Sequence, residues 1–224
     1  MDKHIFNEEQ LKRAEGIIRN PLAKLSSLTS SELRDLAVIW CYYSGKIEGN
    51  TYTYVETETL LKDGITPEKR YEDAKMLKNL HNTFVGELEY IHKGKNQEQI
   101  DERTLFRIHS TISDGLVSNR EDIMQKLGMI LFEQEQYQNP LERAVFLHCN
   151  VARIQPFIDG NKRTSRMLES VVMMNADLIP VYSAKDADIL HYRRGLIAFY
   201  ETGDYTQYAD YFLGRLEERL KEIE

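Results

Sequence analysis

The segment RIQPFIDGNKRTSR, residues Arg153–Arg166, concentrates residue types that bind phosphate groups. Gly160 lets the backbone turn tightly and lets a ligand approach closely. A helix is expected to begin just after this glycine, and the first turn of a helix offers unpaired N–H groups and the positive end of the helix dipole. Arg163 and Arg166 are three residues apart, so they share a face of that helix, and guanidinium groups pair well with phosphate oxygens. The pattern therefore predicts an anion site.

Two further residues of this segment decide what a bound phosphate could undergo. Asp159 places a carboxylate beside the positive cluster, where it suits a divalent cation that accompanies phosphates. Gln155 lies where a phosphate-transfer reaction needs a proton acceptor, and an amide can orient a hydroxyl but cannot hold its proton. The same residues also fit an ordinary turn between two helices with a capping residue and two surface arginines. The local pattern leaves both interpretations open.

The rest of the chain reads as a succession of helices that would position this loop. Apolar residues recur at helical spacing, and the period-2 runs typical of strands are scarce. A helix is expected from Pro140, a residue type favoured in the first helical turn, to about Ile154. The next helix is expected from about Asn161, so the loop would connect two consecutive helices.

Length, composition and charge limit the class of protein. The chain has 224 residues, of which 42% are hydrophobic and 29% charged, which is ordinary for a globular protein with a buried core. We expect a single all-α domain over residues 1–224, consisting of an N-terminal extension (1–30), a core (31–213) and the end of a C-terminal helix (214–224). The formal net charge of −7 argues against nucleic acid or an anionic membrane as the main partner.

The cysteines and the apolar runs indicate a compartment. Cys41 and Cys149 lie in apolar helical runs and are too few for a disulfide framework, which favours a reducing environment. No apolar run approaches the roughly 20 residues of a membrane span, and the first residues do not resemble a signal peptide. We expect a soluble cytoplasmic protein. The amphipathic segment 214–224 is expected to pack on the core or on a second copy of the chain, which leaves a homodimer open.

Two sequence motifs resemble those of one known family. The segment PFIDGNKRTSR resembles the signature of the Fic (Fido) family, which reads H-P-F-x-D/E-G-N-G/K-R-x-x-R between two helices. The matching residues are Pro156, Phe157, Asp159, Gly160, Asn161, Arg163 and Arg166. Far upstream, SGKIEGN (Ser44–Asn50) resembles the S/T-x-x-x-E-G/N inhibitory motif that some Fic proteins carry before the loop. The two motifs stand in the family's order, and the resemblance covers roughly residues 33–213.

The resemblance implies a particular site and activity. Fic proteins usually bind ATP with Mg²⁺ and typically transfer AMP to a hydroxyl group of a target protein, so the chain resembles a protein adenylyltransferase. The residues that would serve this site are Asp159 for the metal, Arg163 and Arg166 for the phosphates, and Gly160, Asn161 and the backbone of Lys162 for the anion hole. Phe157 would pack beneath the loop and fix its shape.

The upstream motif implies self-inhibition. Its matching residues are Ser44, Glu48, Gly49 and Asn50. If Glu48 reaches Arg166, its carboxylate occupies the guanidinium group and repels the γ-phosphate of ATP. A few kcal/mol would then shift the balance between the inhibited and the active state. In some members the same glutamate positions water for removal of AMP, so de-adenylylation also stays open.

Gln155 is the main departure from the family pattern, because the family has a histidine there that accepts the proton of the attacking hydroxyl. Loss of a general base typically costs about 10²–10⁴ in rate. His148 lies seven residues earlier on the same helix, about 10 Å away, which is too far to replace this base and favours a core role. A non-catalytic protein that binds a nucleotide or a protein partner is therefore the second hypothesis.

Two smaller departures concern the transferred group and the target. Lys162 replaces the glycine of most adenylylating members, and the Doc branch, which also has lysine there, transfers a phosphoryl group. Doc-like phosphoryl transfer is the third hypothesis. The segment SDGLVSNREDIMQKLGMILF leaves little room for the β-hairpin flap that aligns the target in Fic enzymes.

Overall fold

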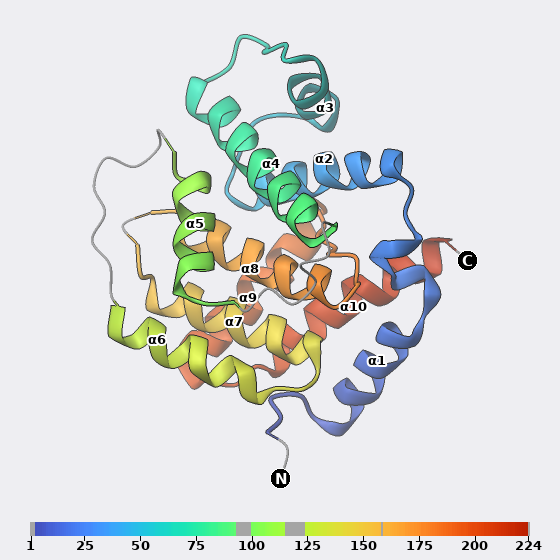
Figure 1. The fold of residues 1–224 in the computed structure, drawn as a ribbon, viewed down its shortest axis with the longest axis vertical. Helices are drawn as coiled ribbons and strands as arrows, with labels where there is room; N and C mark the ends of the chain where they lie inside the picture. The colour runs from blue at the N-terminus through green and yellow to red at the C-terminus, as the bar shows by residue number, and fades with distance from the viewer. Residues whose placement is uncertain (1–2, 93–99, 115–123, 158, 224) are drawn as a thin grey trace.

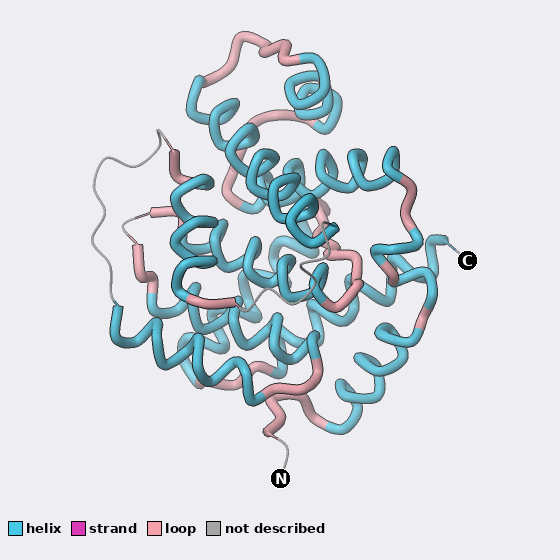
Figure 2. The backbone as a smooth tube through the Cα atoms, in the orientation of Figure 1, coloured by secondary structure: helices cyan, strands magenta, loops and turns pink. Residues whose placement is uncertain are grey.

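The computed structural model describes residues 3–92, 100–114, 124–157 and 159–223. These residues form α-helices joined by loops and three short 3-10 turns, and no β-strand occurs among them (Figures 1 and 2). The helices are α1 (Glu8–Arg19), α2 (Ser30–Ile47), α3 (Tyr54–Asp63), α4 (Tyr71–His92), α5 (Glu102–Ile112), α6 (Met124–Glu133), α7 (Pro140–Ile154), α8 (Asn161–Asn175), α9 (Asp186–Thr202) and α10 (Thr206–Ile223). The predicted all-α fold is confirmed.

Helices α7 and α8 form the centre of the molecule and pack extensively on each other. They begin and end where the sequence predicts: α7 spans Pro140–Ile154, and α8 starts at Asn161. Every residue of α8 from Arg163 to Met174 is buried, so this helix runs through the core beneath α4 and α5 (Figure 1). Because buried polar groups need partners, the arginines, hydroxyl groups and carboxylate on this helix mark a specialised part of the core.

Helix α2 is tied to α8 through the core. The indole Nε1 of Trp40 donates a hydrogen bond to Ser170 Oγ at 2.9 Å, and both side chains are buried. The hydroxyl of Ser170 in turn donates to the backbone oxygen of Arg166 at 2.9 Å. Aromatic packing of Trp40 on Phe84 of α4 holds α2 from the other side, with the ring centroids 5.1 Å apart. Helix α2 is therefore fixed relative to the helix that carries the two arginines.

The C-terminal end of α2 has the hydrogen bonds of a Schellman motif. The N–H of Gly49 donates to Lys46 O at 3.0 Å, and the N–H of Asn50 donates to Gly45 O at 2.9 Å. Gly49 has a φ of 84°, a left-handed conformation that favours glycine. This ending places Glu48 at the C-cap of α2, where the helix meets the centre of the molecule.

The C-terminal helices pack on the chain's own core. Helix α10 contacts α9 and α1, and Arg13 of α1 pairs with Glu217 at 2.8 Å and with Asp210 at 3.0 Å. The predicted boundary at residue 213 lies inside α10, whose buried residues include Leu216 and Leu220. The segment 214–224 was expected to pack either on the core or on a second copy of the chain, and its described part packs on the core.

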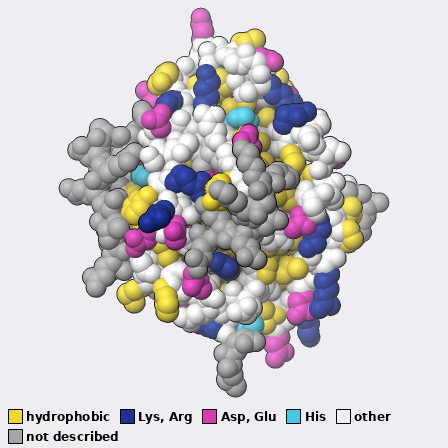
Figure 3. Space-filling model, viewed as in Figure 1, with side chains coloured by type: hydrophobic (Ala, Val, Ile, Leu, Met, Phe, Trp, Pro, Cys, Tyr) yellow, Lys and Arg dark blue, Asp and Glu magenta, His cyan; other side chains and the backbone are white. Residues whose placement is uncertain are grey.

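Three further observations bear on the remaining expectations. No helix in the described part of the chain is both long and apolar enough to cross a membrane. On the face drawn in Figure 3, basic and acidic side chains are interspersed. The segment that was expected to leave little room for a flap includes residues 115–123, which lie outside the described residues, and α6 begins at Met124.

Candidate functional site

The predicted loop lies between the end of α7 and the start of α8. Gln155 is the C-cap of α7 and has a left-handed backbone, with φ 45° and ψ 63°, while its side chain is exposed. Gly160 is the N-cap of α8 with a φ of 78°, and no side chain caps this helix end. The first N–H groups of α8 are therefore not capped by a side chain, which leaves them available to an anion.

Asn161 holds the loop in shape with its side chain. Its Oδ1 accepts a hydrogen bond from the backbone N–H of Phe157 at 2.9 Å, and its Nδ2 donates to the backbone oxygen of Phe157 at 2.7 Å. Phe157 is buried and packs edge-on against Phe106 at a centroid distance of 6.1 Å. The side-chain amide of Asn161 therefore bonds within the loop, and its backbone N–H is the group available to a ligand.

His109 and Ser113 of α5 and its C-cap support the loop from below, and sequence reasoning missed both residues. The His109 ring stacks on Phe157 with centroids 3.4 Å apart, and its Nε2 lies 3.0 Å from the backbone oxygen of Asp159. Ser113 Oγ lies 3.1 Å from the same nitrogen. A Cβ atom at Gly160 would lie 2.9 Å from Ser113 Oγ, so both the backbone angle and the space require glycine. An isolated histidine fifty residues upstream carries no spacing signal that could have revealed this support.

Arg163 has two buried donors without a hydrogen-bond partner within the described residues. Its Nη2 donates to Asp159 Oδ2 at 2.7 Å, whereas its Nε and Nη1 groups are buried and have no hydrogen-bond partner within the described residues. The side chain of Asp159 is 60% exposed, so its other carboxylate oxygen can take a further partner. Buried guanidinium N–H groups without acceptors are costly, and phosphate oxygens would satisfy them. No cluster of three metal-ligating side chains occurs in the described part of the chain, so any metal here would be held by Asp159 together with the phosphates.

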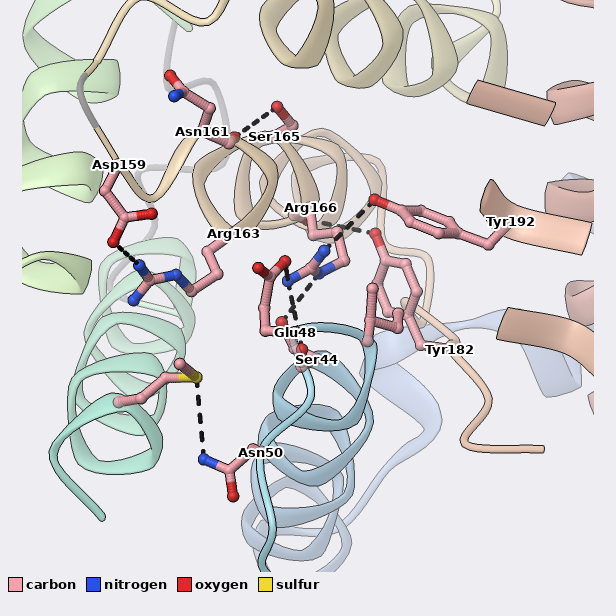
Figure 4. A network of polar contacts seen from close by, with 12 residues as sticks. Ser44, Glu48, Asn50, Asp159, Asn161, Arg163, Ser165, Arg166, Tyr182 and Tyr192 are labelled. Atoms are coloured by element: carbon pink, nitrogen blue, oxygen red, sulfur yellow. Dashed lines mark hydrogen bonds and ion pairs between the residues drawn. The ribbon is translucent and has the colours of Figure 1, made fainter. Parts of the chain in front are cut away.

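Arg166 is fully buried, and its guanidinium group is held mainly by the end of α2 (Figure 4). Nη2 donates to Glu48 Oε1 at 2.7 Å and to Ser44 O at 3.3 Å. Nε donates to Ser44 Oγ at 3.0 Å. On the other side, Nη1 donates to the hydroxyl oxygen of Tyr192 at 3.3 Å. The two motifs that the sequence singled out therefore meet through direct contacts between residues 118 positions apart.

Electrostatics reinforce the contact between Glu48 and Arg166. Burial tends to raise the pKa of Glu48, but the charge and hydrogen bond of Arg166 outweigh it, so this pKa lies below its usual value. Burial tends to lower the pKa of Arg166, yet the Glu48 carboxylate raises it above normal. The charges of Arg163 and Lys162 also lower the pKa of Glu48, so the ammonium group of Lys162 acts on the site although its residue is exposed.

The remaining residues of the upstream motif fix its position. Asn50 is buried, and its Nδ2 donates to the backbone oxygen of Asp73 at 2.9 Å while its Oδ1 accepts from the N–H of Tyr52 at 3.0 Å. Together with Gly49 it anchors the chain immediately after Glu48 to α4. The side chain of Glu48 itself is 23% exposed, so it borders solvent on one side.

A cavity of about 400 Å³ lies elsewhere, between α2, the segment 180–185 and α10. Its lining includes Trp40, Tyr43, Tyr182 and Arg219, and no residue of the loop 155–163 contributes to it. The candidate site is therefore assigned from converging charged groups and free donors at the loop, because the size of a cavity alone says little about its chemistry.

Comparison with known proteins agrees with this geometry. The Fic/DOC family model matches residues 71–173. The protein adenylyltransferase fic-1 of Caenorhabditis briggsae is 23% identical in an alignment of 196 residues that covers 73% of this chain and 37% of that protein. The protein adenylyltransferase Fic of Drosophila grimshawi is 28% identical in an alignment of 172 residues that covers 67% of this chain and 36% of that protein. The chain thus spans about a third of the length of these curated relatives.

Solved structures show the same fold. Fic-1 (residues 134–508) from Caenorhabditis elegans superposes with a TM-score of 0.80 at 19% identity, over 96% of this chain and 70% of that one. A Fic family protein from Desulfovibrio desulfuricans G20 gives a TM-score of 0.76 at 20% identity, over 99% of this chain and 76% of that one. The chain therefore has the Fic fold, and its residues 71–173 match the Fic/DOC family model.

Proposed function

We propose that this chain is a self-inhibited protein adenylyltransferase that binds ATP and transfers AMP to a hydroxyl group of a target protein. The observation that carries the proposal is the ion pair of 2.7 Å between Glu48 of the upstream motif and Arg166 of the loop motif. Curated relatives named protein adenylyltransferase match about two thirds to three quarters of the chain, which supports the same activity.

The loop offers the groups that an ATP phosphate chain needs. The Nε and Nη1 groups of Arg163 lack partners within the described residues, and the first turn of α8 has no capping side chain. Arg166 would add a third set of donors once Glu48 releases it. Mg²⁺ usually binds one or two carboxylates together with phosphate oxygens, so Asp159 suits the ion, which would neutralise phosphate charge.

Glu48 would inhibit by occupying the phosphate side of Arg166. Its carboxylate accepts from Nη2, the same nitrogen that a terminal phosphate would need. Its depressed pKa keeps it ionised at neutral pH, so it would also repel a nearby phosphate. ATP would bind in a reactive form only when this carboxylate turns away.

Gln155 would leave the site without its proton acceptor. The amide stands at the C-cap of α7 and can orient a hydroxyl without taking its proton. His148 offers no replacement, because its ring is fully buried and its Nε2 lies 3.1 Å from the Tyr192 hydroxyl. We expect transfer by this chain to be slower by about 10²–10⁴ than by a form with histidine at this position.

The test is label transfer from ATP carrying the isotope on its α-phosphate. Three forms are compared with Mg²⁺ and cell lysate: the chain itself, Glu48→Gly, and Glu48→Gly combined with Gln155→His. We expect strong labelling of a protein band only in the double variant. If the double variant binds ATP and labels nothing, the proposed transfer is wrong.

Two observations favour the second and third candidate functions. Gln155 favours a nucleotide- or partner-binding protein without transfer, and the double variant would then label nothing. Lys162, whose charge reaches Glu48, favours phosphoryl transfer, which ATP labelled on the γ-phosphate would detect. De-adenylylation through Glu48 would appear as loss of label from a modified target.

Location, domain organisation and assembly complete the proposal. Both cysteines, Cys41 and Cys149, are free and buried, which suits the reducing cytoplasm. We place the whole reaction in one domain formed by residues 1–224, with the target hydroxyl supplied by another protein. Whether the protein acts as a monomer or as a homodimer is answered by light scattering.

A further inference from the structure

A line of buried polar side chains runs from Arg166 away from Glu48. Arg166 Nη1 donates to the hydroxyl oxygen of Tyr192 at 3.3 Å. That oxygen lies 3.1 Å from His148 Nε2, and His148 Nδ1 lies 2.9 Å from the carboxylate of Glu169. All four side chains are essentially inaccessible to solvent. Polar groups at this depth need partners, so the line is a defined part of the core.

Chemistry fixes the direction of the first hydrogen bond in this line. A guanidinium group only donates, so the Tyr192 oxygen accepts from Arg166. The same oxygen forms a second hydrogen bond with His148 Nε2, whose direction depends on which ring nitrogen of His148 carries hydrogen. The contact with Glu169 lies at ion-pair distance without meeting hydrogen-bond geometry, so its contribution is electrostatic.

The far end of the line is fixed by two tyrosines. Tyr208 donates to Glu169 Oε2 at 2.8 Å, and Tyr182 donates to Glu169 Oε1. Tyr182 also lies 3.4 Å from the backbone oxygen of Arg166. Burial and the neighbouring Glu169 raise the pKa of both phenols, so they remain donors at neutral pH. The two tyrosines thus hold the Glu169 carboxylate in place beside His148.

We infer that Tyr192 and His148 are positioning residues that hold the Arg166 guanidinium group ready for a phosphate after Glu48 leaves. The inference rests on the proposed nucleotide site. Release of Glu48 frees one N–H of Nη2, while Ser44 still binds Nε and the other N–H of Nη2, and Tyr192 still binds Nη1. The guanidinium plane therefore stays oriented, and its free edge meets the incoming phosphate without a search through side-chain rotamers.

The chain offers matched variants for a test. Tyr192→Phe removes the hydroxyl and leaves the ring. His148→Leu removes the hydrogen-bond partner of the Tyr192 hydroxyl, whereas His148→Gln keeps a polar group near the position of Nε2 and is expected to restore part of the effect. Tyr211→Phe is the control, because the Tyr211 ring packs on Tyr192 at 5.8 Å and its buried hydroxyl has no hydrogen-bond partner within the described residues.

The first readout is nucleotide affinity by calorimetry in the Glu48→Gly background. Because only ATP carries a terminal phosphate for Arg166, we expect Tyr192→Phe and His148→Leu to weaken ATP about tenfold and AMP little. Tyr211→Phe should change neither affinity. Equal losses for ATP and AMP, or none for either, would overturn the inference.

The second readout needs no nucleotide. The ¹⁵N relaxation of the Arg166 Nε–H group in Glu48→Gly is expected to report an ordered side chain, and a mobile one after Tyr192→Phe. Unchanged order after this substitution would also overturn the inference. If Glu48→Gly binds no ATP at all, the proposed function fails, and the relaxation measurement still decides the role of Tyr192. Melting temperatures identify a variant that fails to fold, and Tyr192→Phe is the mildest of the set.

Discussion

Replacing Glu48 by alanine should make the protein less stable and yet bind ATP more tightly. The carboxylate lies 2.7 Å from a fully buried guanidinium group, and its loss leaves the charge of Arg166 without its anionic partner. Removing one partner of a fully buried ion pair costs roughly 3–5 kcal/mol. Because the Glu48 side chain is 23% exposed and Arg166 keeps its bonds to Ser44 and Tyr192, we expect a loss of about 2 kcal/mol.

The same contact must break when ATP reaches Arg166, so its removal favours binding by a similar amount. A gain of about 2 kcal/mol corresponds to about 30-fold tighter ATP binding. For a chain of this size the stability loss lowers the melting temperature by about 4–8 °C without nucleotide. Bound ATP, at a concentration of about 100 times its dissociation constant, raises the free energy of unfolding by about 2.7 kcal/mol. The opposite signs of the two effects distinguish displacement of an inhibitor from general damage.

The assays are thermal unfolding with and without ATP and Mg²⁺, and calorimetric titration with ATP. Glu15→Ala is the matched control, since it removes an exposed carboxylate paired with Arg19 across one helical turn. Such a pair contributes only about 0.3–0.5 kcal/mol and lies on another helix. A Glu48→Ala protein that melts like its parent, or that binds ATP no more tightly, would refute the reasoning.

Three further predictions concern the loop and the pH dependence of its contacts. Gln155→Gly should exceed Gln155→Ala in stability by about 1 kcal/mol in chemical denaturation, because the left-handed backbone strains any residue with a Cβ; equal stabilities would contradict this strain. Gly160→Ala should lower the free energy of unfolding by about 2 kcal/mol and abolish ATP binding. Adding Ser113→Ala should recover part of the stability, and no recovery would mean that the backbone conformation alone causes the loss. The folded pKa of Glu48 lies below its unfolded value of 4.5, so its stabilising contribution is complete well above that pH and is lost as the pH falls below it. The stability difference between the parent and Glu48→Ala should therefore shrink in urea titrations below about pH 4.5, and a difference that grows on acidification would contradict the ion pair.

Motif residues could be predicted from the sequence because their spacing encodes the local backbone. The glycine that starts α8, the turn of arginines after it and the glycine–asparagine end of α2 all follow from helix geometry and capping. Their meeting was expected only from a resemblance between two short motifs, since nothing in local spacing places Glu48 beside Arg166. The family domain and the helical fold were likewise correctly predicted.

The residues that support the site could not be predicted from the sequence, for a physical reason. His109, Tyr192 and Glu169 reach the site through tertiary packing of α5, α9 and the core side of α8. Each stands among other polar residues of its helix, and the local pattern of such a residue is the same whether it faces solvent or a buried partner. The sequence predicted a metal role for Asp159, whereas its bond to Arg163 depends on side-chain geometry that spacing does not determine.

The hydrogen bond between Trp40 and Ser170 limits how far α2 could move during activation. It joins α2 to α8 only two turns from Glu48, so swinging α2 away would break a buried hydrogen bond and the packing of an indole ring. Rotation of Glu48 about its own side-chain bonds breaks neither. We therefore expect the inhibited and released forms to have the same radius of gyration, tumbling time and sedimentation rate. Small-angle scattering would therefore not distinguish the two forms. A spectroscopic probe of an individual side chain would be needed to distinguish them.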